Sequence, residues 1–266
     1  MSASINIYLE TEYADVRLND AHLIWDLSSP IFVPEDITAQ VALTNFFIPN
    51  SMYIIDANNN KLVITTGGTT YTITLTDGNY NANELDTELE TRANAAFAAG
   101  GAGTTVLTVT YGGATNRYTF RIQTGGVDTN WIIETATTCF KEIGITGNLQ
   151  YNYSGTQLLP NQVDLGGTPN IFVKCLNLST NNRTTEGAIS NTLAKIPVTV
   201  PPLGYVYMEQ KEPIYFDITN RIIKQIDIDL QNQRFQDLIL GGVSWGLTLT
   251  FRFKDNPTLS LREQEL

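Results

Sequence analysis

Alternation of hydrophobic and polar residues is the dominant pattern of this sequence. In the segment 245–253, every second position is hydrophobic and the positions between are small, polar or charged. This period of two is typical of a strand with one buried face. The same pattern occurs at 226–230, 71–76, 107–111 and 118–122. Further strands are predicted at about 5–10, 22–27, 39–48, 61–66, 131–135, 171–178, 195–200, 204–210 and 214–218.

Residues 78–125 carry signals of a different kind. Asn81 stands three residues before Glu84, which is the spacing of a helix capping box. Apolar side chains then recur every fourth residue, and Gly100-Gly101 ends the run. The pattern predicts an amphipathic helix at about 82–98, packed against a sheet. Gly112-Gly113, between two alternating segments, predicts a β-hairpin.

These elements predict the fold class. About a dozen strands, one helix and no strand–helix alternation favour an all-β protein, an antiparallel jelly-roll β-sandwich with one helix-plus-hairpin insertion. A parallel α/β fold is excluded. Because 266 residues fit one sandwich domain, we expect a single jelly-roll domain at 1–255, an insertion at about 78–125 and a C-terminal tail at 256–266. The polar segment 177–192 is predicted to be a long exposed loop.

Composition and charge limit the partners. Only 16% of the residues are charged and 42% are hydrophobic, which suits sheets whose outer faces are covered by neighbours but equally suits an ordinary β-domain. The net charge is −11, and the basic residues are scattered. Nucleic-acid binding needs clustered Lys and Arg to displace counterions. No direct contact with nucleic acid is therefore expected.

The chain's cellular compartment follows from its start and its cysteines. Met1 is followed by Ser-Ala-Ser-Ile-Asn-Ile, which has neither the charged nor the apolar region of a signal peptide. No apolar run has the length of a membrane span. Cys139 and Cys175 stand in apolar contexts, which favours buried thiols over a disulfide. We expect a protein that is made inside the cell and not secreted, with its three glycosylation sequons unused.

Catalysis by a histidine would depend on His22, because it is the sole histidine of the chain. A Ser-His-Asp or Cys-His site would have to use it, yet no G-x-S-x-G motif is present. We interpret His22 as a partly buried structural residue. A cluster of several histidines is impossible, and the cysteines lack C-x-x-C spacing, so no zinc site is predicted.

Two further motifs resemble binding sites but lack essential residues. Asp56-Ala-Asn-Asn-Asn60 begins like a calcium loop, but Lys61 replaces the required glycine and Gly67 the bidentate glutamate. We interpret the segment as a polar turn between two strands. Gly100-Gly-Ala-Gly103 precedes a strand, whereas a phosphate-binding loop opens a helix.

The acidic residues select no catalytic pair. Glycosidases need two opposed carboxylates. We interpret the acidic residues of the predicted helix as a solvated face, whose negative charges interact favourably with the N-terminal end of the helix dipole. These are Glu84, Asp86, Glu88 and Glu90. The sequence therefore predicts a protein that is not an enzyme, with no catalytic, cofactor-binding or metal-binding residues.

An ordered set of segments across 40–253 carries a family resemblance. They are Val41–Ile55, in which a predicted strand runs into Ile48-Pro-Asn; Ile73–Tyr80; Leu158–Leu165 followed by Ile171-Phe-Val; Leu193–Val198; and Ile226–Leu230 followed by Leu247–Phe251. In this order they resemble the penton and minor capsid proteins of virophages, polinton-like viruses and related large double-stranded DNA viruses. That family implies a jelly roll assembled into icosahedral capsids, without catalytic residues.

The resemblance also implies a place in the particle. The chain is short for two complete jelly rolls plus the insertion, which favours a penton subunit at the fivefold vertex over a double-barrel major capsid protein. It implies a homopentamer that contacts the major capsid protein, is located in the virion and is assembled inside the host cell. Two alternatives remain open: a minor capsid or cement protein that bridges major capsid trimers, and a receptor- or glycan-binding β-sandwich of a spike.

Overall fold

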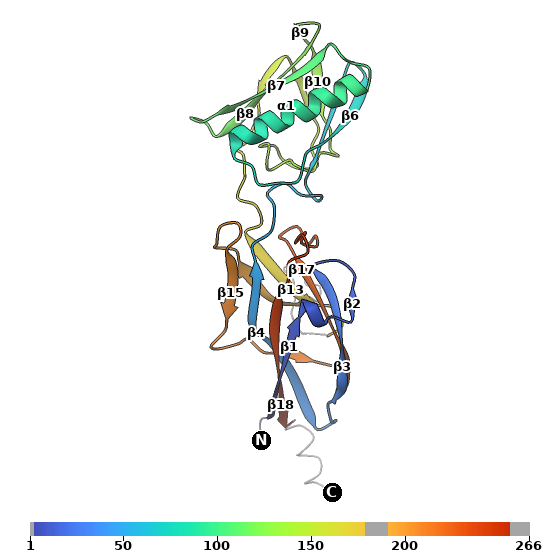
Figure 1. The fold of residues 1–266 in the computed structure, drawn as a ribbon, viewed down its shortest axis with the longest axis vertical. Helices are drawn as coiled ribbons and strands as arrows, with labels where there is room; N and C mark the ends of the chain where they lie inside the picture. Colours follow the sequence, from blue (N-terminus) through green and yellow to red (C-terminus); the bar gives the residue numbers. More distant parts are fainter. Residues whose placement is uncertain (1–2, 179–190, 256–266) are drawn as a thin grey trace. The chain divides into compact units, whose positions relative to one another are not determined.

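The computed structural model describes residues 3–178 and 191–255 (Figure 1). The described chain is nearly all β, with antiparallel strand pairing throughout, one α-helix and a short 3-10 helix at Thr11–Tyr13. This confirms the predicted all-β class. The chain forms two compact units, Met1–Met52 with Thr168–Leu266 and Tyr53–Gly167. The expected insertion at about 78–125 lies inside the second unit, whose bounds are wider.

The first unit contains two sheets. Sheet I has the strand order β1-β18-β4-β15, with β16 also paired to β4, and sheet II has the order β14-β13-β17-β3-β2. Their strands are β1 (Ala3–Glu10), β2 (Val16–Arg17), β3 (His22–Phe32), β4 (Ile37–Pro49), β13 (Asn170–Cys175), β14 (Thr192–Pro197), β15 (Tyr205–Glu209), β16 (Phe216–Ile218), β17 (Ile222–Gln231) and β18 (Gly246–Asp255).

The connectivity of this unit is that of a jelly roll. When the short strands β2 and β16 are left aside, the first strand pairs with the last, the second with the second to last, and so on inward. The pairs are β1–β18, β3–β17, β4–β15 and β13–β14. A long hairpin rolled over itself into two sheets gives this order. The predicted jelly roll is therefore confirmed, and the second unit is inserted between β4 and β13.

Alternation along the strands builds the core of the first unit. Leu247, Leu249 and Phe251 of β18 are buried on the face predicted from their spacing. They pack into one cluster with the inner residues of β17 and with Trp25, whose ring meets Trp245 edge to face at 5.9 Å. The cluster includes Cys175, and burial raises the pKa of this thiol to about 12. Both cysteines are buried thiols that form no disulfide, as expected.

The second unit has its own sheets and its own core. One sheet has the order β11-β10-β5-β6 and the other the order β12-β8-β7, with β9 paired to β8. The elements are β5 (Lys61–Thr66), β6 (Thr69–Thr74), α1 (Ala82–Ala99), β7 (Thr105–Gly112), β8 (Arg117–Thr124), β9 (Val127–Asp128), β10 (Asn130–Ile133), β11 (Tyr151–Ser154) and β12 (Thr156–Leu158). The insertion extends beyond 78–125 because β5, β6, β10 and β11 pair with one another and share this core.

Helix α1 follows its sequence signals closely. The Asn81 side chain accepts hydrogen bonds from the backbone amides of Asn83 and Glu84, and the Glu84 carboxylate accepts one from the Asn81 backbone amide, so the capping box is formed. The predicted apolar stripe is buried against the sheets, where Phe97 meets Tyr71 edge to face. The predicted hairpin is β7–β8.

Two predicted segments lie wholly or partly outside the described residues. The tail at 256–266 is one, and most of the polar segment 177–192 is the other. Asp56–Asn60 is described and forms the expected polar turn, in which the Asn58 amide donates to Asp56 Oδ1 at 2.8 Å.

Candidate functional site: an apolar groove and a histidine–aspartate cluster

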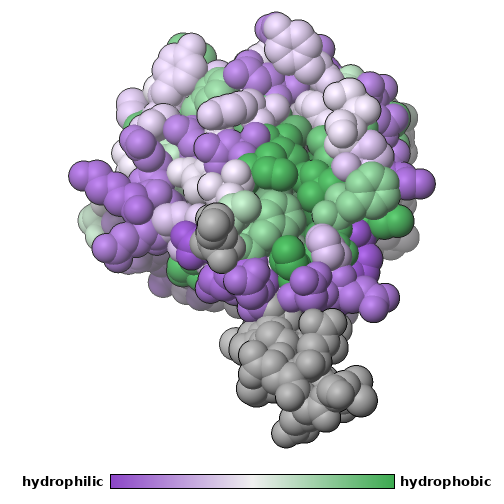
Figure 2. Space-filling model, turned by 90° about the horizontal axis from the view of Figure 1, so that it is seen from below, coloured by the Kyte–Doolittle hydropathy of each residue, from purple (hydrophilic) through white to green (hydrophobic). Residues whose placement is uncertain are grey.

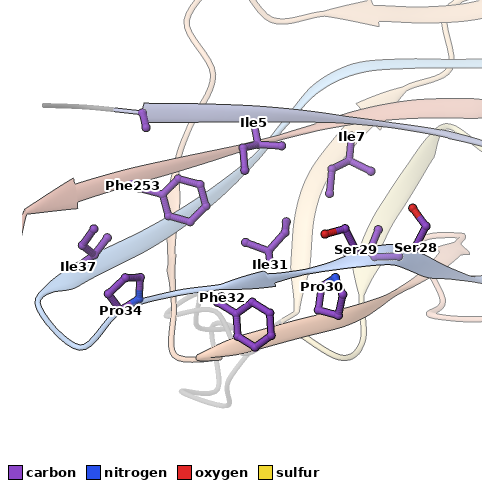
Figure 3. Close-up of a pocket in the computed structure, with 12 residues that line it drawn as sticks. Ile5, Ile7, Ser28, Ser29, Pro30, Ile31, Phe32, Pro34, Ile37 and Phe253 are labelled. Carbon is purple, nitrogen blue, oxygen red and sulfur yellow. The ribbon is translucent and has the colours of Figure 1, made fainter.

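The first unit has an apolar groove between the edges of its two sheets. Among the described residues, β1 is the edge strand of sheet I, and β2 covers β3 only at Leu23 and Ile24. The groove between β1 and the uncovered part of β3 has a volume of about 660 Å³ (Figure 3). Its lining is almost entirely apolar: Ala3, Ile5, Ile7, Leu27, Ser28, Ser29, Pro30, Ile31, Phe32, Pro34, Ile37 and Phe253.

Burial falls along β1 toward this groove. Leu9, Ile7 and Ile5 share the inner face of sheet I, yet Leu9 is buried, Ile7 is half-buried and Ile5 is 43% exposed. Figure 3 shows Ile5, Ile7 and Phe253 pointing toward β3, and Ile31 pointing back toward them. Figure 2 shows hydrophobic side chains gathered in one area of the surface and bordered by hydrophilic ones. Inward-facing hydrophobic side chains therefore reach solvent here.

An irregularity of β3 shapes the groove. Its register with β17 passes from Asp26↔Gln225 to Ile31↔Ile223, so the strand carries extra residues at 27–30 that have no partner on β17. Pro30 has no amide hydrogen to donate, and proline within sheets is confined to edges and bulges. The bulge places Leu27 to Pro30 along the groove.

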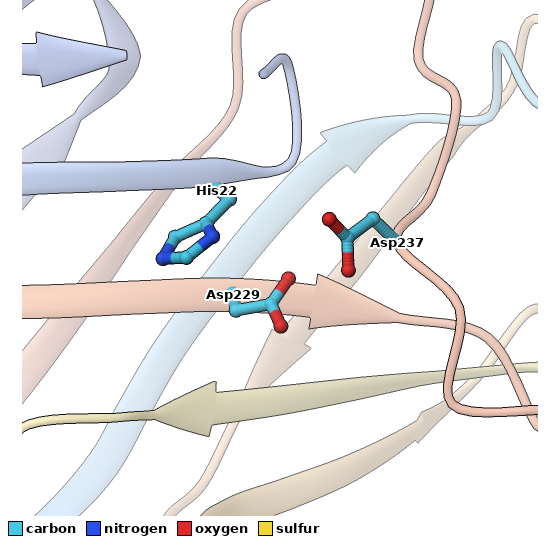
Figure 4. Close-up of side chains that lie close together, drawn as sticks. All are labelled: His22, Asp229 and Asp237. Carbon is cyan, nitrogen blue, oxygen red and sulfur yellow. The ribbon is translucent and has the colours of Figure 1, made fainter. Parts of the chain in front are cut away.

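A second cluster lies on the outer face of sheet II. His22, Asp229 and Asp237 each place one potential metal-ligand atom within 4.8 Å of the other two (Figure 4). His22 begins β3 and stands opposite Asp229 of β17. Asp237 follows β17 and is held next to it by an antiparallel bridge to Gln231.

Hydrogen bonds fix each of these three side chains. His22 Nε2 lies 2.8 Å from Asp227 Oδ1, and Asn19 Nδ2 donates to Asp237 Oδ2 at 2.8 Å. Gln231 Nε2 donates to Asp229 Oδ2 at 2.6 Å, whereas Asp229 Oδ1 is buried without a hydrogen-bond partner in the described part of the chain.

Asp229 lies in an unfavourable place for a charge. The residue is 3% exposed, and burial first, followed by the charge of Asp237, raises the pKa of its carboxyl to about 6. The charges of His22 and Lys174 and the Gln231 hydrogen bond act in the opposite direction. A buried carboxylate oxygen with no partner costs free energy unless a proton or a cation satisfies it.

The structure places His22 beside carboxylates that the sequence pattern did not bring together. The residue is half-buried and paired, as a structural histidine would be. A single histidine rules out only a cluster of several histidines, whereas carboxylates from distant segments can lie beside it. A signal was present, because Asp227 and Asp229 stand on the polar face of the alternating segment 226–230.

The acidic residues of α1 differ in part from the expected solvated face. Glu84 caps the helix, but Glu88 and Glu90 are half-buried and anchor the helix to neighbouring backbone. Glu88 accepts hydrogen bonds from the amide and hydroxyl of Thr76, and Glu90 accepts one from the Val109 amide at 2.6 Å. These carboxylates stabilise the fold of the second unit.

Comparisons with known proteins gave matches among solved structures. No protein-family model matches the chain, and no curated protein sequence matches it. The mavirus penton protein structure is similar with 8% identity and a TM-score of 0.44, covering 94% of this chain and 99% of that one. A chain of the Sputnik virophage structure determined by cryo-EM is similar with 15% identity and a TM-score of 0.41, covering 97% and 99%. Among the described residues, no helix is both long and apolar enough to cross a bilayer.

Proposed function

We propose that this chain is a non-enzymatic structural subunit of the icosahedral capsid of a double-stranded DNA virus, and that it is the penton at the fivefold vertex. The observation that carries the proposal is the apolar groove between β1 and β3. A jelly roll that exposes inward-facing hydrophobic side chains at one edge is incompletely covered when isolated. A neighbouring subunit would supply the missing cover.

The physical basis is hydrophobic burial at the groove. Covering apolar surface contributes roughly 25 cal/mol for each Å² removed from water. Ile5 and Phe32 are 43% and 68% exposed at this edge, so a neighbour's side chains gain free energy by packing against them. Within residues 3–178 and 191–255, the outer backbone edge of β1 has no partner strand and also offers hydrogen bonds to an added strand.

A closed ring needs a second, different surface on each subunit, because cyclic symmetry above twofold uses head-to-tail interfaces. Sheet I offers one on its outer face. Tyr207 and Tyr205 of β15 and Tyr8 of β1 are 60%, 67% and 73% exposed, and tyrosine is enriched in protein–protein interfaces. We propose that the groove of one subunit packs against a neighbour in a homopentamer, and that the flanks contact the major capsid protein.

The ordered sequence resemblance across 40–253 supports this assignment, and the net charge of −11 supports partners other than nucleic acid. In this proposal the protein is located in the virion and is assembled inside the host cell without secretion. A cement protein bridging major capsid trimers would share the fold but not the fivefold symmetry. A spike domain would bind a receptor or glycan.

Two measurements test the proposal. Native mass spectrometry of the purified protein should give a homopentamer at high concentration, and quantitative mass spectrometry of purified particles should give five copies for each vertex. A protein that stays monomeric and is missing from particles contradicts the capsid role. A higher copy number without pentamers assigns it to cement, and a specific glycan-array ligand assigns it to a spike.

The groove itself is tested by Ile5→Glu. The side chain is already 43% exposed, so the variant should fold with an unchanged melting temperature, while a charge in the groove should prevent assembly. The matched control is Ile214→Glu in the same unit, where the isoleucine is 65% exposed and lies outside the groove. Equal assembly of the two variants in sedimentation velocity experiments would exclude the groove as an interface.

A further inference from the structure

We propose that His22, Asp229 and Asp237 form a binding site for a divalent transition-metal ion, Zn²⁺, that fastens the segment after β17 to the outer face of sheet II. Imidazole nitrogen and carboxylate oxygen are both ligand types that zinc uses in proteins. The three side chains come from β3, β17 and the segment that follows β17.

The spacing of the ligand atoms suits a single ion. Zinc binds nitrogen and oxygen at roughly 2.0–2.2 Å, which places tetrahedral ligands about 3.4 Å apart. The three candidate ligand atoms are within 4.8 Å of one another, so binding an ion would require these side chains to move closer together. Figure 4 shows one ring nitrogen of His22 on the side of the ring that faces the two aspartates.

Hydrogen bonds around the cluster match those of a metal site. Ligating histidines usually donate their other ring nitrogen to a carboxylate, which fixes the tautomer. His22 Nε2 is 2.8 Å from Asp227 Oδ1, which leaves Nδ1 for the ion. Asn19 and Gln231 likewise orient the two aspartates by donating to their carboxylates.

The buried oxygen of Asp229 is the independent observation that points to a cation. Asp229 is 3% exposed, and its Oδ1 has no hydrogen-bond partner within the described residues. Lys174 stands opposite Asp229 on β13, but its Nζ lies over the Phe235 ring at 4.8 Å from the centroid. A metal ion between the side chains would satisfy this oxygen.

The ligand chemistry selects among divalent ions. Calcium and magnesium prefer sites made of oxygen atoms, with six or more ligands. An imidazole nitrogen favours zinc and the later transition metals over both. With three protein ligands, the remaining coordination position is left to water.

Metal binding would stabilise a specific part of the jelly roll. Asp237 directly precedes Leu238, which is buried in the core of the first unit, and the bridge to Gln231 holds this segment beside β17. An ion shared by Asp237, Asp229 and His22 links this connection to two central strands. The ion would hold the connection between β17 and β18 in place.

Calorimetric titration of the chelator-treated full chain with ZnCl₂ tests the proposal. We expect one zinc ion for each chain, with the affinity reduced at least about tenfold in Asp237→Asn. The matched control is Asp36→Asn, an exposed aspartate of the same unit between β3 and β4, which should bind zinc as the unchanged protein does. If Asp237→Asn fails to fold by circular dichroism, His22→Gln takes its place.

A spectroscopic readout locates the ion. Because His22 is the sole histidine, long-range ¹H–¹⁵N NMR spectra contain one imidazole, and zinc should shift its Nδ1 resonance while Nε2 remains protonated. Unchanged imidazole signals, or equal zinc affinity in Asp237→Asn and Asp36→Asn, would overturn the site. Tighter binding of CaCl₂ than of ZnCl₂ would overturn the assignment of the ion.

Discussion

Gly144 shows how one backbone position constrains the second unit. Its φ is +81°, in the left-handed region that favours glycine, and a Cβ there would collide with the backbone oxygen of Asn161. The Asn161 amide donates to the Gly144 carbonyl at 2.9 Å, so the two segments cannot separate without losing this bond. Gly68 has a similar φ of +79°, but open space surrounds it.

We expect Gly144→Ala to lower the free energy of unfolding of the second unit by roughly 2–4 kcal/mol, because the strain of the left-handed conformation adds to the collision. Gly68→Ala, which adds only the strain, should cost about 1–2 kcal/mol. Urea denaturation of both variants, followed by circular dichroism, measures the difference. Equal losses of unfolding free energy in the two variants would show that the Asn161 backbone moves away from the added Cβ at little cost.

At the scale of elements, the Glu88 carboxylate links helix α1 to the segment before it by hydrogen bonds. Glu88 accepts hydrogen bonds from the amide of Thr76 at 2.8 Å, from its hydroxyl at 2.7 Å and from Arg92 Nε at 2.9 Å. Burial alone would raise the pKa of Glu88, but the hydrogen bonds from Thr76 and Arg92 outweigh it and hold the pKa below its usual value of 4.5. The ionised carboxylate is therefore the form that stabilises the fold.

The sign of the pH dependence follows from this depressed pKa. The stabilising contribution is fully present above the unfolded-state pKa near 4.5 and is lost as the pH falls through the lower folded-state pKa. We expect Glu88→Gln to cost about 1–3 kcal/mol at pH 7, with a smaller cost below pH 4. Urea denaturation at pH 7 and below pH 4 measures the cost of the substitution under each condition. Glu35→Gln, in an exposed turn, is the control, and a cost for Glu88→Gln that does not change with pH would contradict the prediction.

At the scale of the whole molecule, two hydrophobic cores are assigned to separate units. The cluster of the first unit is drawn from β1, β3, β4 and β13–β18 with their connections, and that of the second from residues 55–159. Cores that share no residue are expected to lose stability independently. The insertion therefore carries its own folding free energy.

We expect Leu89→Ala, at a fully buried position of α1, to destabilise the second unit by about 2–5 kcal/mol and to leave the first unit unchanged. Ile228→Ala, fully buried in β17, should do the reverse. Hydrogen exchange followed by mass spectrometry reports the two units in separate peptides. Faster exchange spread over both units in either variant would show that they unfold together.

Local signals were enough to predict most elements of this protein. The alternation at 245–253 predicted the buried face of β18, and the Asn81–Glu84 capping box predicted where α1 begins. Each signal spans a few residues, because the pleat of a strand and the turn of a helix repeat over that distance. The all-β class followed from these signals alone.

The tertiary structure decided which distant segments lie side by side, because the local signals carry no information about such contacts. His22 and Asp227 are 205 positions apart, and only the pairing of β3 with β17 brings them together with Asp229. The same pairing, through its shift at 27–30, opens the apolar groove. The bounds of the second unit depend on which strands share a core. Register and pairing are set by contacts between distant segments, so the sequence determined the strands, and the fold determined the sites between them.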